Sequence, residues 1–264
     1  MRTARLPADV KWRRGPGPAP LAELAWAALA LLFAALALVL LLGLELHALA
    51  AGGAAFALAA VLVAVHAPAH AVRGHGLGAA NRVTGVRAWL TCVLLMLALG
   101  AATNTAAQWS MIVLATLALS LDGVDGALAR RLDQQSRFGA RFDMETDAAL
   151  LAVLCLAVWL SGKLGAWVLA IGAMRYGFVA AGRLWPRLRG ELPPSTARRV
   201  VCVVQGIALC VALGPIIPPW LAATVVAVAL GLLSWSFARD CAWLWRHSAG
   251  ETRSTRPSDA SVSR

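Results

Sequence analysis

The feature that most constrains how this chain can fold is a series of apolar runs, each about as long as a helix that crosses a bilayer. Such a helix needs roughly 20 mainly apolar residues. Hydrophobic residues make up 60% of the chain and charged residues 14%, whereas a soluble domain carries about 25% charged residues. The sequence therefore predicts an all-α integral-membrane fold, a polytopic helical bundle of about eight transmembrane helices. The runs cover approximately residues 21–43, 51–72, 88–104, 109–132, 138–161, 165–184, 198–215 and 220–245.

Basic residues gather in every second connection between these runs. They precede the first run and follow the eighth, whereas the alternate connections hold only Lys163. Because Lys and Arg are enriched on the cytoplasmic side of membrane proteins, we expect both termini in the cytoplasm, at a bacterial-type inner or plasma membrane. This topology accounts for the net charge of +11, so no nucleic-acid partner is expected.

Acidic residues are concentrated between Asp122 and Asp147, a window that begins inside the fourth apolar run and ends inside the fifth. Asp122 and Asp125 are three residues apart, and Asp143 and Asp147 are four apart, so each pair shares one face of a helix. The two helices are consecutive and antiparallel. All four carboxylates are therefore expected to converge at one depth, near the cytoplasmic side.

Converging carboxylates repel one another unless cations lie between them. Carboxylate oxygens suit Mg²⁺ or Mn²⁺, and four carboxylates are enough to bridge two such ions. Two-ion sites commonly stabilise the entering and leaving oxygens of a phosphoryl displacement. Gly123 and Gly126 leave space beside the carboxylates, and Arg130 follows one turn later, in a position to meet a phosphate.

The acidic window also has two alternatives to a metal site. Ion pairing with neighbouring arginines is favoured for Asp133 and Glu145. A membrane cation or proton transporter would also place carboxylates within the membrane. A transporter predicts polar residues along several helices, however, whereas here they are concentrated at the ends of two.

The acidic window is part of a longer pattern with fixed spacing. Its positions are Asp122, Asp125, Gly126, Ala129, Arg130, Gly139, Asp143 and Asp147. The pattern resembles the signature of the CDP-alcohol phosphatidyltransferase family. The resemblance is compatible with the six runs from about residue 88 to 245 and does not extend to the first two. Since the family core has six helices, the first two runs look like an added N-terminal pair.

The resemblance implies an enzyme of phospholipid biosynthesis. Family members transfer the substituted phosphate of a CDP-alcohol, usually the phosphatidyl group of CDP-diacylglycerol, to the hydroxyl group of a small alcohol, and they release CMP. Carried onto this chain, two divalent ions would be held by Asp122, Asp125, Asp143 and Asp147. Asp147 would also be the general base that takes the acceptor proton.

The remaining motif positions would serve the donor. Gly126, Ala129 and Gly139 would give the nucleotide close access, and Arg130 would contact the pyrophosphate. The resemblance also implies membrane lipid as the surroundings and a homodimer as the assembly.

A second, shorter resemblance lies upstream. Asn81, Thr84 and Arg87 resemble the N-x-x-T-x-x-R run that precedes the first core helix in this family, with Ala80 where many members have proline. They are candidate nucleotide-side contacts. The alternative is an ordinary membrane-surface helix whose arginines extend towards the headgroups.

Arg175 lies near the middle of the sixth run, where an unpaired guanidinium is costly. Together with Arg198 and Arg199 it forms a candidate site for an acceptor phosphate. Arg175 could instead pair with an aspartate, and the other two could be positive-inside anchors.

The expected organisation has four parts. Residues 1–20 form a cytoplasmic segment, 21–73 two additional helices, 74–246 an interfacial segment with the six-helix catalytic core, and 247–264 a disordered cytoplasmic tail. The acceptor stays open among glycerol 3-phosphate, inositol phosphate, serine and choline.

Overall fold

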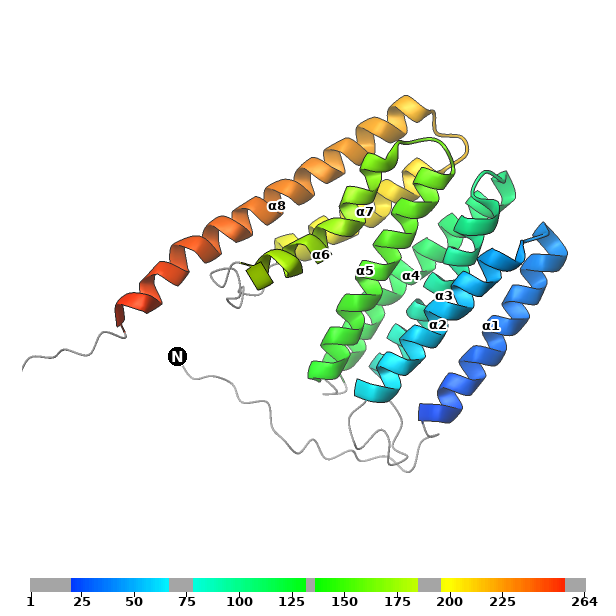
Figure 1. Cartoon of the computed structure of the whole chain (residues 1–264), viewed down its shortest axis with the longest axis horizontal. Coiled ribbons are helices and arrows are strands. Elements are labelled where there is room, and N and C mark those ends of the chain that lie inside the picture. Colours follow the sequence, from blue (N-terminus) through cyan, green and yellow to red (C-terminus); the bar gives the residue numbers. More distant parts are fainter. Residues whose placement is uncertain (1–19, 67–77, 132–135, 185–195, 255–264) are drawn as a thin grey trace, which may run out of the picture.

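The structure is a computed structural model that describes residues 20–66, 78–131, 136–184 and 196–254. These residues form eight α-helices and one short 3-10 helix, with no strand among them. The elements are α1 Pro20–Leu42, α2 Leu46–His66, α3 Ala79–Ala101, α4 Thr105–Arg131, α5 Arg137–Leu160, η2 Ala166–Val168, α6 Leu169–Leu184, α7 Thr196–Leu213 and α8 Pro219–Ser254 (Figure 1). The predicted all-α bundle is confirmed.

Five of the helices in the described part are long and apolar enough to cross a membrane, namely α1, α2, α3, α4 and α8. The first turns of α5 carry several charged residues, and α6 has only 16 residues after the short 3-10 helix η2. The chain is therefore a polytopic integral-membrane protein.

One clear departure from the predicted boundaries is at α3. This helix begins at Ala79 rather than near residue 88. Gly78, with φ of 87°, marks its start, and the sequence from Ala79 to Ala101 contains no proline that would interrupt it. The run from Asn81 to Arg87 is thus the beginning of a core helix, and the alternative of a separate membrane-surface helix is wrong.

The C-terminal boundary also differs from the prediction. Helix α8 continues to Ser254, beyond the apolar run that was expected to end near residue 245. No proline follows Pro219 until Pro257, so nothing in the sequence stops the helix earlier. Residues 247–254 are therefore helical, while the rest of the predicted disordered tail lies outside the described residues.

The centre of the bundle is made by α3, α4 and α5, with α1 and α8 at opposite edges (Figure 1). Small residues let these helices approach closely: Ala107, Ala115 and Ala118 of α4 are completely buried. A Cβ on Gly172 of α6 would lie 2.9 Å from the Cα of Ala152 in α5. The contact between α5 and α6 therefore depends on a glycine at this position.

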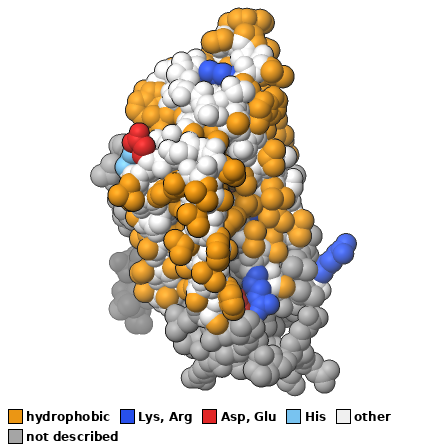
Figure 2. All heavy atoms as spheres, turned by 90° about the vertical axis from the view of Figure 1, so that its right-hand side faces the viewer, with side chains coloured by type: hydrophobic (Ala, Val, Ile, Leu, Met, Phe, Trp, Pro, Cys, Tyr) orange, Lys and Arg blue, Asp and Glu red, His pale blue; other side chains and the backbone are white. Residues whose placement is uncertain are grey.

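The outer surface is apolar, as a bilayer requires. Leu32, Phe33 and Leu40 of α1 are all more than half exposed. Figure 2 shows the face of the molecule on the side of α1, where hydrophobic side chains spread over most of the described surface and charged ones are few. Lipid tails would cover this face, because they are as apolar as the side chains themselves.

The helices alternate in direction, so the two ends of the bundle differ in content. At one end α1, α3, α5 and α7 begin and α2, α4, α6 and α8 end. Asp122, Asp143 and Asp147 lie towards that end, which we call the aspartate end. The connections from α1 to α2, α3 to α4, α5 to α6 and α7 to α8 lie at the opposite end.

Candidate active site

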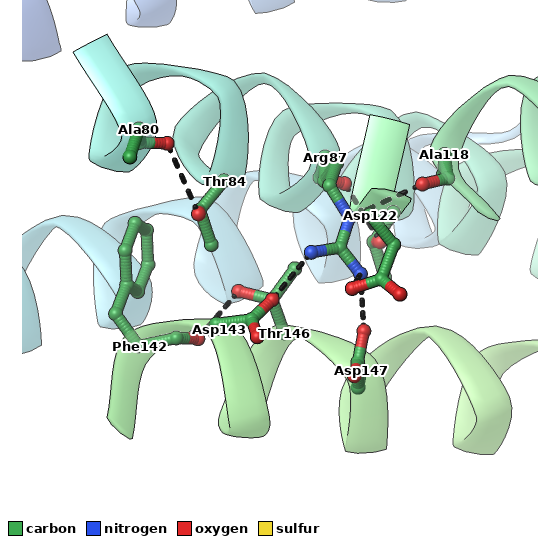
Figure 3. Close-up of polar contacts among 10 residues, drawn as sticks. Ala80, Thr84, Arg87, Ala118, Asp122, Phe142, Asp143, Thr146 and Asp147 are labelled. Atoms are coloured by element: carbon green, nitrogen blue, oxygen red, sulfur yellow. Dashed lines mark hydrogen bonds and ion pairs between the residues drawn. The ribbon is translucent and has the colours of Figure 1, made fainter. Parts of the chain in front are cut away.

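A buried arginine from α3 lies at the centre of the site. The guanidinium of Arg87 has no solvent exposure and reaches carboxylates on two other helices (Figure 3). Its Nη2 lies 3.0 Å from Oδ1 of Asp122, and its Nη1 lies 2.5 Å from Oδ1 of Asp143. Nη2 also donates to Asp147, and Nε donates to the carbonyl oxygen of Ala118 at 3.1 Å. All three nitrogen atoms of this buried guanidinium are thus engaged by oxygen atoms.

Helix geometry explains why these carboxylates meet. Asp143 and Asp147 are four residues apart on α5 and share one face. Asp122 lies on α4, the helix that precedes α5 and runs antiparallel to it. One oxygen from each of the three carboxylates lies within 4.8 Å of the others. The predicted convergence is confirmed for Asp122, Asp143 and Asp147.

The charge of this cluster suits a divalent cation. Three carboxylates face one guanidinium, so the cluster carries an excess of negative charge when all groups are ionised. Their oxygens are hard ligands of the kind that Mg²⁺ and Mn²⁺ prefer. The carboxylates are only partly buried, which leaves them open to an ion and a substrate. The residues present therefore fit a divalent metal.

Four predicted site residues cannot be placed in this way. The side chains of Asp125, Ala129, Arg130 and Arg175 lie outside the described residues. The backbone of the first three belongs to α4, which holds Asp125 one helical turn beyond Asp122. Gly126 is also part of α4. Their predicted roles stay predictions: Asp125 as a metal ligand, Gly126, Ala129 and Arg130 as nucleotide and pyrophosphate contacts, and Arg175 as a contact for the acceptor phosphate.

The first turns of α3 and α5 touch each other at Gly139. A Cβ on this glycine would lie 2.6 Å from Oδ1 of Asn81 and 3.1 Å from Oγ of Ser136. Ser136 caps α5 by accepting a hydrogen bond from the backbone nitrogen of Gly139 at 2.9 Å. The two segments that were recognised separately in the sequence therefore meet in space, and a larger residue at position 139 would displace the Asn81 side chain.

Thr84 lies between Asn81 and Arg87 on the inner face of α3. It is buried, and its hydroxyl donates to the carbonyl oxygen of Ala80 at 3.3 Å (Figure 3). Asn81, Thr84 and Arg87 are thus all directed towards the same region of the bundle. Arg87 contacts the carboxylates themselves, a role that the sequence interpretation missed. An arginine directly before a long apolar run was the signal that could have indicated it, because a charge carried into the bundle needs a partner.

The other candidate arginines lie at the start of α7. Arg198 pairs with Asp240 of α8, with Nη1 and Oδ2 3.6 Å apart, and Arg199 is exposed. Helix α7 begins at the aspartate end, so both residues share that end with the carboxylates. Their predicted role towards an acceptor phosphate is not tested by this geometry.

Comparison with known proteins places this site in a wider context. A family model described as CDP-alcohol phosphatidyltransferase matches residues 77–236, which run from the start of α3 into α8. A protein of Mycobacterium tuberculosis named probable phosphatidylglycerophosphate synthase is 30% identical over 155 residues, 58% of this chain and 74% of that protein. The CDP-diacylglycerol–glycerol-3-phosphate 3-phosphatidyltransferase of Pseudomonas fluorescens is 28% identical over 157 residues, 53% of this chain and 78% of that protein. No solved structure matched the chain.

Proposed function

This chain belongs to the CDP-alcohol phosphatidyltransferase family, and we propose that it transfers the phosphatidyl group of CDP-diacylglycerol to glycerol 3-phosphate. The membership makes it an enzyme of phospholipid biosynthesis that acts on a CDP-alcohol and an acceptor alcohol. CDP-diacylglycerol as the donor and glycerol 3-phosphate as the acceptor are what we propose. The support for this proposal is the name of the Pseudomonas relative, which specifies this donor and this acceptor.

The observation that carries the proposal is the convergence of Asp122, Asp143 and Asp147, with their oxygens within 4.8 Å of one another. These are motif positions on two different helices, and only the fold brings them together. We propose that they bind Mg²⁺ or Mn²⁺, and that Asp125 completes the ligands for a second ion. A bound divalent cation would neutralise the diphosphate of the donor and the charge that develops on the departing CMP.

The chain's own residues supply the remaining chemistry. The acceptor hydroxyl attacks the phosphorus that carries the lipid, forming a new P–O bond while the bond from that phosphorus to the CMP oxygen breaks. Asp147 takes the proton of the hydroxyl as general base. Arg87 holds the carboxylates of Asp143 and Asp147 in position through its ion pairs. Gly126, Ala129, Arg130 and Gly139 are proposed to receive the nucleotide and its pyrophosphate.

Three further points belong to the same proposal. The distribution of basic residues supports a cytoplasmic location for the aspartate end and for both termini. Arg175, Arg198 and Arg199 are proposed to receive the phosphate of the acceptor. A homodimer is expected from the family resemblance. The alternative of a cation or proton transporter has no support from the family membership or from the relatives.

The test is CMP release from CDP-diacylglycerol by the purified protein with Mg²⁺ or Mn²⁺ and one acceptor at a time. Glycerol 3-phosphate is expected to support release, and Asp143→Asn to abolish it. Glu145→Gln is the matched control, because Glu145 lies on the same helix with an exposed side chain. Release with inositol phosphate, serine or choline alone would correct the acceptor. No release with any acceptor would contradict the assigned donor.

A further inference from the structure

The N-terminal pair of helices, α1 and α2, lies outside the residues that match the family, yet it touches the elements that form the site. The family match begins at residue 77, after α2 has ended at His66. Both helices pack along α3 (Figure 1). Their outer faces are apolar and exposed, as expected towards lipid. Their inner faces make two contacts at the aspartate end, one with the first turn of α3 and one with the start of α5.

The first contact is an ion pair between α1 and the first turn of α3. Nη2 of Arg82 lies 2.7 Å from Oε1 of Glu23, and Nε of Arg82 donates to the same oxygen at 3.2 Å. The Glu23 side chain is only 16% exposed, so the pair is partly shielded from solvent. Arg82 directly follows Asn81, the residue that touches Gly139. The α1 helix therefore holds the turn of α3 that faces the candidate nucleotide side.

The second contact is apolar and joins the end of α2 to the first turn of α5. Val63 is buried against Phe138 and Phe142, whose rings stack with centroids 5.9 Å apart. These two aromatic residues flank Gly139, and Phe142 directly precedes Asp143. The α2 helix therefore bears on the turn of α5 that carries a motif glycine and leads into the carboxylates.

Close packing along α3, away from the aspartate end, also fixes the position of the helical pair. A Cβ on Gly52 of α2 would lie 2.6 Å from Cε of Met96 in α3. A Cβ on Gly100 of α3 would lie 2.8 Å from Cγ of Leu44, in the connection between α1 and α2. Tightly packed interfaces do not deform continuously. The packed helical pair therefore keeps the first turns of α3 and α5, which it contacts, in fixed positions.

Both contacts act on the first turns of α3 and α5, which approach each other at Asn81 and Gly139. A Cβ on Gly139 would lie 2.6 Å from Oδ1 of Asn81, so the two first turns approach closely and a shift of either one changes their separation. We propose that α1 and α2 form a brace that sets the separation of the first turns of α3 and α5, with Glu23 and Val63 as positioning residues for the nucleotide of the donor. This inference rests on the proposed function.

The brace acts on binding more than on the chemical step. The carboxylates are held by Arg87, which belongs to α3 and reaches the side chains of Asp122 on α4 and Asp143 on α5. Loss of Glu23 or Val63 is therefore expected to weaken nucleotide binding while the geometry of the carboxylates stays intact. A role in stability or membrane insertion alone would change the unfolding midpoint instead.

The experiment compares matched variants of the full chain in detergent micelles. Glu23→Gln is matched by Glu45→Gln, since Glu45 lies on the connection between α1 and α2 at the opposite end and pairs with His47 at 3.1 Å. Val63→Ala is matched by Val61→Ala, because Val61 is 57% exposed on the same helix. For each variant the measurements are the Kd for CDP with Mg²⁺, the KM for CDP-diacylglycerol, kcat and the unfolding midpoint.

Glu23→Gln and Val63→Ala are each expected to raise the Kd for CDP and the KM between about threefold and tenfold, since small misplacements of binding groups have large effects. Their kcat is expected to stay within about twofold of the original value, and the controls within about twofold in every measurement. The exchange of charges in Glu23→Arg with Arg82→Glu is expected to restore the Kd towards that of the unchanged protein.

An unchanged Kd in both Glu23→Gln and Val63→Ala would overturn the proposal. So would a Kd that rises only in proportion to a fall in the unfolding midpoint, or a charge exchange that fails to restore binding. The CDP measurement separates this inference from the proposed reaction. If the unchanged protein binds CDP but releases no CMP with any acceptor, the reaction is wrong while the Kd values still decide the brace. No binding of CDP by the unchanged protein contradicts both.

Discussion

A basic side chain lies beside each end of α5 and contacts several oxygen atoms, but the oxygens are of different kinds at the two ends. Near the start of α5, Arg87 lies among the carboxylates of Asp122, Asp143 and Asp147. Just beyond its end, Lys163 donates through Nζ to the carbonyl oxygens of Ala212 and Ile217, each at 3.3 Å, and to that of Gly214. The first arrangement joins charge to charge, and the second joins charge to neutral backbone.

The difference in charge separates a reactive end from a structural one. Around Arg87 the carboxylates outnumber the guanidinium, and the excess negative charge favours a divalent cation. Around Lys163 the carbonyl oxygens belong to the end of α7 and to the connection from α7 to α8. Ala212 lies in the last turn of α7, where carbonyl oxygens have no partner within the helix. Lys163 therefore links two connections, and these hydrogen bonds of its ammonium group bring no carboxylate that could bind a cation.

The largest expected effect comes from Asp147→Asn at the reactive end. The amide cannot accept the proton of the acceptor hydroxyl, so kcat is expected to fall by about 10²–10⁴-fold. CMP release measures the change, with Glu145→Gln as the control. Activity of Asp147→Asn within about tenfold of the original would remove Asp147 from its role as base.

Arg87→Met is expected to have the next largest effect, on stability. It leaves three partly exposed carboxylates close together without the guanidinium that offsets their charge, at a cost below the roughly 3–5 kcal/mol for a fully buried pair. Denaturant unfolding with a chelator would show the loss, and Mg²⁺ is expected to recover much of it. Arg82→Met, which breaks a partly exposed pair, serves as the control. A loss that Mg²⁺ does not reduce would mean that the cluster does not bind the ion.

Gly139→Ala tests the close junction of the reactive end. The new Cβ would lie 2.6 Å from Oδ1 of Asn81, and overpacking of this kind costs about 1–3 kcal/mol. Because the new methyl group displaces Asn81, a proposed nucleotide contact, the Kd for CDP is expected to rise by about tenfold. Gly85→Ala is the matched control, because a Cβ there meets nothing within 4 Å. Equal Kd values for the two variants would remove the junction from nucleotide binding.

Lys163→Met is expected to have a smaller effect, confined to stability. It removes the hydrogen bonds to the three carbonyl oxygens, for a loss of about 1 kcal/mol. Metal binding and KM are expected to be unchanged, since Lys163 lies beyond the opposite end of α5 from the carboxylates. Loss of Mn²⁺ binding in this variant would show that the two ends are coupled, which contradicts their separate roles.

The smallest expected effect is the pH dependence that Lys163 adds. Burial lowers the pKa of its ammonium group below the ordinary value of 10.5. Between the folded-state pKa and 10.5 the unfolded chain binds more protons, so the stability contributed by Lys163 increases as pH rises through this window. Unfolding midpoints measured towards pH 10.5 should therefore diverge from those of Lys163→Met. A difference that does not change with pH would contradict the altered pKa.

The sequence was sufficient for the class of fold, because apolar runs of membrane-spanning length have few other solutions. It was less reliable where polarity and helicity disagree. The start of α3 contains Asn81, Arg82 and Arg87, so hydropathy placed the helix near residue 88 rather than at Ala79, although nothing there interrupts the backbone. Hydropathy reports where apolar residues lie, whereas the helix itself begins directly after Gly78, its N-cap.

The site was predictable to the extent that it follows from helical spacing. The i, i+4 spacing of Asp143 and Asp147, with Asp122 on the preceding antiparallel helix, was enough to expect a cluster. The position of Arg87 before an apolar run indicated that it needs an acidic partner, but which carboxylates it meets depends on how α3 packs against α4 and α5. The contact between Asn81 and Gly139 is likewise tertiary, as is the tie at Lys163.

The central claim is that the carboxylates around Arg87 bind a divalent cation and that the oxygens around Lys163 do not. Calorimetric titration of the purified protein with Mn²⁺ tests it most directly, in the unchanged chain, Asp143→Asn and Lys163→Met. Saturable binding is predicted for the unchanged chain and for Lys163→Met. The affinity of Asp143→Asn for Mn²⁺ is predicted to be at least about tenfold lower. Equal binding by the unchanged chain and Asp143→Asn would contradict the claim.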